Sequence, residues 1–218
     1  MTASRTDSLI DRLAADVRPV KPLRAPALRA LMVLAPIIAV AAIAIAMLGD
    51  VAGLAARYSG REALLALEMA AMLATAVLAI VAAFFVSVPG RSYRWIAAPV
   101  PFFAVWLLVS GLGCYEDLVR RGGADWELGE SLQCLLFILA ASALLAPLLV
   151  WRLACARPID PLPVALLGGL GVSAMSALVL QFFHPFTVTL IDLAVHLVAM
   201  LIVVAAAGLL NRRIPAFR

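Results

Sequence analysis

The sequence predicts an all-α integral membrane protein, built as a six-transmembrane-helix bundle with a short cytoplasmic N-terminal amphipathic helix. Its 218 residues are 65% hydrophobic and only 14% charged, and the mean hydropathy is +1.08. A water-soluble domain of this size does not sustain that balance, because it has too few charged side chains to cover its surface. The apolar residues also gather in long runs, and the basic residues gather in the tails and loops. These three observations together define the fold class.

Six apolar stretches are long enough to cross the roughly 30 Å hydrocarbon core of a bilayer, which takes about 20 helical residues. No soluble domain or repeat separates them. The first run is too long for the core of a signal peptide, so we expect it to be retained as a span. The predicted spans are about 29–48, 63–88, 95–114, 131–151, 162–183 and 187–210.

Two kinds of residue inside these stretches predict how the helices pack. A ladder of small residues at four-residue spacing, Gly169, Ser173 and Ala177, favours close approach of a neighbouring helix within the bundle over a dimer interface. The oligomeric state is left open. Prolines are tolerated in transmembrane helices, where they cause kinks. Four of them lie in the predicted spans: Pro36, Pro99, Pro101 and Pro147.

The basic residues predict the orientation. Only four of the 17 Lys and Arg residues, Arg57, Arg61, Arg120 and Arg121, lie on one side, and the rest lie on the side of the two tails. Cytoplasmic segments carry the excess of Lys and Arg, so both termini are predicted to be cytoplasmic, in agreement with an even number of spans. Because the formal net charge of +4 is scattered over loops and tails, no direct contact with nucleic acid is expected.

The stretch 6–20 is the part outside the spans most suited to recognise a partner. Thr6 or Asp7 is predicted to cap a helix of about three turns, and Pro19 closes it. A helix this short is marginal in water and needs a surface to pack on. Its three Asp against two Arg favour a protein partner over lipid, the alternative being a plain lead-in to the first span. The apolar side consists of Leu9, Ile10, Leu13 and Val17, and Asp11, Arg12 and Asp16 lie on the other sides.

Six ionisable or thiol side chains fall in the half of the bundle that this topology places outside. Ionisable groups in hydrocarbon are costly and therefore informative. Thiolates with imidazoles suit zinc or copper(I), and two thiols suit a redox disulfide, so either chemistry predicts an outward-facing sensor with a transition metal ion as a candidate signal. The alternative is structural, with Asp192 and His196 paired along one helix and the cysteines acting as small hydrophobes. The candidates are Glu68, Cys114, Cys134, His184, Asp192 and His196.

The sequence does not favour an enzyme. It contains no Gly-rich phosphate loop, no HExxH and no GxSxG motif. A small multi-pass membrane transporter of an ion or small solute is the alternative, because Glu68, Asp192 and His196 could bind an ion or relay protons. The internal repeat that many transporters carry is not detectable between the two halves.

The chain resembles the membrane-bound anti-sigma factors of the NrsF type (negative regulator of sigma F). The likeness rests on the N-terminal LIDRLAADVRPVKPL, the late HPFTVTLIDLAVHLVAM and the six-span hydropathy. It implies a protein of the bacterial inner membrane that holds an extracytoplasmic-function (ECF) sigma factor through residues 1–28 and releases it on metal or oxidative stress. The domain division is then 1–28 for the cytoplasmic segment, 29–210 for the membrane domain and 211–218 for a cytoplasmic basic tail.

The resemblance also assigns roles to residues. The apolar side of the N-terminal helix would dock on the sigma factor, and its charged residues would tune specificity. Members of the family carry two outer cysteines, of which Cys134 matches the first. At the place expected for the second, this sequence reads QFFHPF and offers His184. Either Cys114 is then the thiol partner, or His184 makes the site a metal-binding one.

Overall fold

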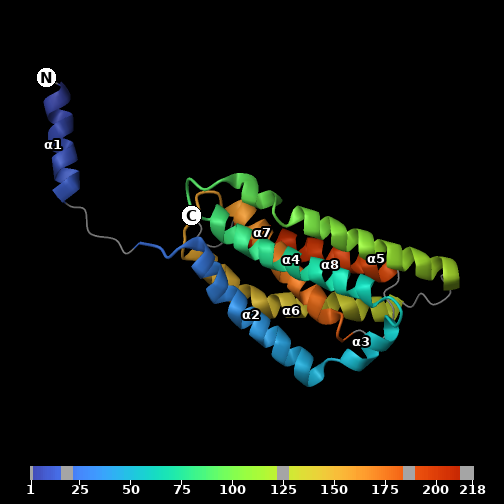
Figure 1. Ribbon diagram of the computed structural model, residues 1–218. Coiled ribbons are helices and arrows are strands. Elements are labelled where there is room, and N and C mark those ends of the chain that lie inside the picture. The colour runs from blue at the N-terminus through green and yellow to red at the C-terminus, as the bar shows by residue number, and fades with distance from the viewer. Residues whose placement is uncertain (1, 16–21, 122–127, 184–189, 212–218) are drawn as a thin grey trace.

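The computed structural model describes residues 2–15, 22–121, 128–183 and 190–211, and over these residues it contains helices and no strand. Short connections join the helices into one bundle, and α1 stands apart from it (Figure 1). A 3₁₀ helix, η1 (Tyr93–Ala97), precedes α5. The α-helices are α1 (Thr2–Ala15), α2 (Pro26–Leu48), α3 (Val51–Arg57), α4 (Glu62–Val86), α5 (Val100–Arg121), α6 (Leu128–Ala154), α7 (Pro161–Leu180) and α8 (Leu190–Asn211).

Six described helical segments are long and apolar enough to cross a membrane, which confirms the predicted spans and the all-α class. They lie in α2, α4, η1 with α5, α6, α7 and α8, and the chain is a multi-pass membrane protein. Successive spans run in opposite directions (Figure 1). The end of the bundle that carries α3 is called the α3 end below. The opposite end, where α2 begins and α6 ends, is called the tail end.

The central helix of the bundle is α7, which packs against α4, α6 and α8 and is the most buried of the spans. Its glycines permit this. A Cβ atom on Gly169 would lie 3.0 Å from Val204 Cα in α8, and one on Gly171 would lie 2.5 Å from Ile80 Cγ1 in α4. The small-residue ladder therefore serves packing inside the bundle, as predicted, because Ser173 and Ala177 are buried as well.

Three details differ from the sequence prediction. The N-terminal helix begins at Thr2, so Thr6 and Asp7 lie inside it and do not cap it; no Gly or Pro in the preceding residues prevents the extra turn. The connection after α2 contains a further helix, α3, which starts where Asp50 Oδ1 accepts a hydrogen bond from Gly53 N at 2.8 Å. Pro99 lies before α5 and Pro101 lies in its first turn. The N–H groups of a first turn have no acceptor within the helix, so proline breaks no helical hydrogen bond at these positions.

Candidate functional site

The apolar side of α1 is uncovered. Leu9, Ile10 and Leu13 are 55%, 55% and 62% exposed, and Asp11 and Arg12 are exposed beside them. A short helix with an open apolar side is marginal alone and is stabilised by docking on another surface. The two other residues predicted to contact a partner lie outside the described residues: Asp16 and Val17.

Glu68 is buried in α4 and held by α5. Its residue is only 6% exposed, and the Ser110 hydroxyl donates a hydrogen bond to Glu68 Oε1 at 2.6 Å. Nearer the α3 end of the same interface, Arg61 Nη2 and Glu116 Oε2 form an ion pair at 2.9 Å. A carboxyl group in hydrocarbon needs a donor of this kind, because an unsatisfied polar atom there is costly. Two polar contacts therefore join α4 to α5 close to the α3 end.

Sequence reasoning found Glu68 but missed the residues that surround it. Ser110 lies four residues before Cys114, on the same face of α5, so a polar side chain inside an apolar run was the available signal. The sequence prediction places Arg61 and Glu116 in two separate connections between spans, and only the packing of α4 against α5 brings them together.

The cysteines are distributed over both ends of the bundle. Cys114 in α5 and Cys134 in α6 are buried near the α3 end, and Cys155 is exposed at the tail end. All three are thiols. α5, which carries Cys114, packs mainly against α4, whereas α6, which carries Cys134, packs mainly against α7. Both helices also contact α8.

Asp192 and His196 lie one turn apart on the same face of α8, and both are buried. This face is turned into the bundle, where α8 packs against α7, α6 and α5. His184, the remaining candidate, lies outside the described residues. Among the residues that the structure does describe, no three His, Cys, Asp or Glu side chains gather closely enough to hold a metal ion. The five described candidates therefore share one end of the bundle without forming a three-ligand site.

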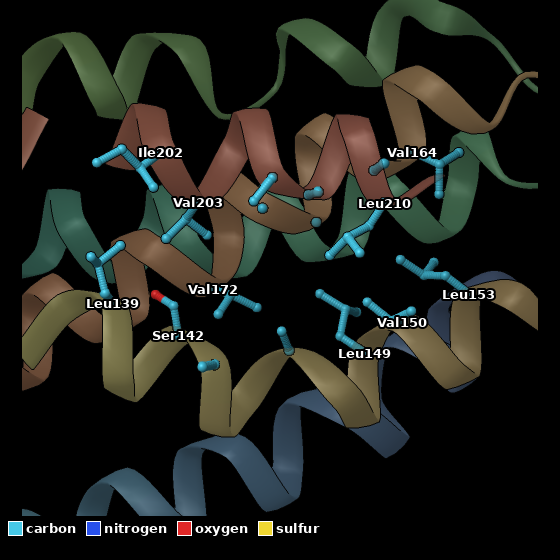
Figure 2. Close-up of a pocket in the computed structure, with 17 residues that line it drawn as sticks. Leu139, Ser142, Leu149, Val150, Leu153, Val164, Val172, Ile202, Val203 and Leu210 are labelled. Carbon is cyan, nitrogen blue, oxygen red and sulfur yellow. The ribbon is translucent and has the colours of Figure 1, made fainter. Parts of the chain in front are cut away.

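A cavity of about 280 Å³ opens between α6, α7 and α8 in the half of the bundle nearer the tail end (Figure 2). Its walls are aliphatic, with Leu149, Val172 and Val203 among them. The one polar side chain in the lining is Ser142, whose hydroxyl donates a hydrogen bond to Ser176 Oγ at 3.1 Å. The cavity therefore offers an apolar surface and no group for acid–base or ligand chemistry, and none of the described candidates lines it.

Comparison with protein families matches residues 13–216 to the family NrsF, negative regulator of sigma F. The match begins within α1 and continues through all six spans. Comparisons with curated proteins and with solved structures found no significant match. A family of sigma-factor regulators is not an enzyme family, and the match selects the regulator over the transporter. The family match covers nearly the whole length, and it agrees with the exposed helix and the six-span bundle described above. The chain therefore belongs to the NrsF family of negative regulators of sigma F, which are anti-sigma factors.

Proposed function

We propose that this protein retains an ECF sigma factor at the bacterial inner membrane through α1 and releases it when a metal ion or an oxidant acts at the α3 end. The observation that carries the proposal is the uncovered apolar side of α1, where Leu9, Ile10 and Leu13 are each more than half exposed. An amphipathic helix that lays its apolar side into a groove is a common mode of recognition. Asp11 and Arg12 flank the apolar side and contribute charge complementarity.

The proposed orientation puts both tails in the cytoplasm, where a sigma factor is available. It rests on the basic residues, which are concentrated on the side of the tails. The α3 end then faces outward, and the buried Glu68, Cys114, Cys134, Asp192 and His196 lie in the outer half. Thiol and imidazole groups are those on which a soft metal ion or an oxidant acts, and this end of the bundle carries both.

The link between the two ends is α2, which leads from the N-terminal segment to the α3 end. Directly after it, Asp50 N donates a hydrogen bond to Phe182 O at 2.8 Å, so the α2–α3 turn is tied to the end of α7. Repacking at the α3 end would therefore move α2 and, with it, the segment that carries α1. Moving an equilibrium from mostly bound to mostly free takes about 5.5 kcal/mol of differential binding, within reach of one coordinated metal ion.

Retention by α1 is tested by purifying two forms of the protein from native membranes: the full chain and a chain that lacks residues 2–20. We expect a sigma factor to be identified by mass spectrometry with the full chain and to be lost with the deletion. A sigma factor recovered equally with both forms would show that another part of the chain binds it. Recovery with neither form would contradict retention at the membrane.

Sensing at the α3 end is tested with single cysteine variants and a reporter gene under a promoter that depends on the sigma factor. In the wild type, Zn²⁺ or hydrogen peroxide should raise reporter output. With Cys134→Ser we expect output to stay near the uninduced level, because the thiol on which the signal acts is gone. Cys155→Ser is the matched control, since that thiol lies at the tail end. A normal response from both Cys134→Ser and Cys114→Ser would refute the thiol sensor.

A further inference from the structure

A buried arginine lies at the tail end, where α2, α4 and α6 meet. Arg29 is in the first turn of α2 and is only 9% exposed. Its Nη2 donates a hydrogen bond to the carbonyl oxygen of Arg152 at 3.2 Å, and its Cζ lies 5.1 Å from the ring centroid of Phe84 in α4. Its Nη1 is buried, and no group among the described residues accepts a hydrogen bond from it.

A second arginine occupies the same corner. Arg152 lies in the last turn of α6 and is half-buried. Its Nε is also buried without an acceptor among the described residues. Its Cζ lies 4.7 Å from the ring centroid of Trp151, and Trp151 is 60% exposed on the outer surface of the bundle. The corner therefore carries two positive charges beside an exposed tryptophan, and exposed Trp side chains typically lie at the membrane interface.

These two charges lack a carboxylate in the part of the chain that the structure describes. Among the described residues, the ion pair is Arg61–Glu116, which lies at the other end of the bundle. The carboxylate of Asp160 is hydrogen-bonded elsewhere, because it accepts a hydrogen bond from the Tyr93 hydroxyl. The start of α2 adds partial positive charge, because no side chain caps it. One buried and one half-buried guanidinium group, each with a buried N–H donor that lacks an acceptor among the described residues, are costly unless an anion contacts them.

We propose that Arg29 and Arg152 form a binding site for the phosphate group of an anionic phospholipid in the leaflet at the tail end. Guanidinium groups bind phosphate oxygens through paired N–H donors, and basic pockets between transmembrane helices bind anionic lipid head groups. The depth of the two arginines in the membrane suits a lipid head group, because both residues lie within one turn of the end of a spanning helix. This site is separate from the sensor and does not depend on the identity of the sigma factor.

Arg29 also has a structural role, because the carbonyl of Arg152 is one of the last in α6 and lacks a partner within the helix. That role uses Nη2 and leaves Nη1 without an acceptor among the described residues. A purely structural arginine would stabilise the protein equally in every lipid. A lipid site predicts stabilisation that depends on the head group, which is the property to be measured.

The test uses the purified full-length protein in a neutral detergent, with thermal unfolding followed while one additive is titrated. The additives are phosphatidylglycerol, the zwitterionic phosphatidylcholine and inorganic phosphate. We expect phosphatidylglycerol to raise the unfolding midpoint of the wild type and phosphatidylcholine to have much less effect. Arg29→Gln and Arg152→Gln should each need about tenfold more phosphatidylglycerol for the same shift, since each removes a charge-assisted contact.

The matched control is Arg91→Gln, which removes one exposed charge at the same end, where Arg91 Cζ lies 5.9 Å from the Phe85 ring centroid. It should respond to phosphatidylglycerol like the wild type. If inorganic phosphate alone reproduces the shift, the site stands but its ligand is free phosphate. If Arg29→Gln does not fold, Arg152→Gln decides. The proposal is overturned if Arg152→Gln responds like Arg91→Gln, or if the wild type does not distinguish phosphatidylglycerol from phosphatidylcholine.

Discussion

Replacing Leu13 with Asp is expected to abolish retention of the sigma factor while leaving the protein in the membrane. Leu13 is 62% exposed in this structure and would be covered in the complex. Burying a leucine contributes about 1.5–3 kcal/mol, and burying a carboxylate in its place adds a further penalty. We therefore expect affinity to fall by at least about 100-fold. Co-purification of the sigma factor with solubilised protein measures the loss, and a promoter that depends on the sigma factor should become active without any stimulus.

The control for this variant is Ala15→Asp on the same helix. Ala15 is exposed and lies two residues from Leu13, so it points to a different side of α1. It introduces the same charge and should leave retention within about twofold of the wild type, as expected for a position away from the contact. Equal amounts of both variants in the membrane fraction rule out misfolding as the cause. Normal retention by Leu13→Asp would show that the apolar side of α1 is not the binding surface.

Replacing Gly171 with Val is expected to destabilise the bundle strongly. A Cβ at this position would lie 2.5 Å from Ile80 Cγ1 and 3.1 Å from both Ala76 O and Ile80 N. Two of these atoms belong to the backbone of α4, so the clash cannot be relieved by a rotamer change alone. Overpacking of a core costs about 1–3 kcal/mol or more. The unfolding midpoint of the detergent-solubilised protein should therefore fall by on the order of 5 °C or more.

Gly111→Val in α5 is the matched control, because a Cβ there meets no atom within 4 Å. Valine has a higher helix propensity than glycine, so this variant should unfold at or slightly above the wild-type midpoint. If both variants unfold like the wild type, α7 is not held against α4 by the close approach at Gly171.

The number of spans, the all-α class and an N-terminal amphipathic helix were all predictable from the sequence. Each depends on a local property, such as the length of an apolar run or the four-residue spacing of Leu9 and Leu13. Helix ends were less predictable. The extra turn at Thr2 and the helix α3 depend on backbone hydrogen bonds that compete closely with other local conformations.

Tertiary structure alone decided which helix lies at the centre and which residues meet. An apolar run does not indicate which of its sides faces protein and which faces lipid, because both surroundings are apolar. The central position of α7, the Ser110–Glu68 contact and the Arg61–Glu116 pair therefore follow from packing. The same holds for Arg29, which the sequence shows only as one of the basic residues on the side of the tails. Its burial against Phe84 and Arg152 arises only when α2, α4 and α6 come together.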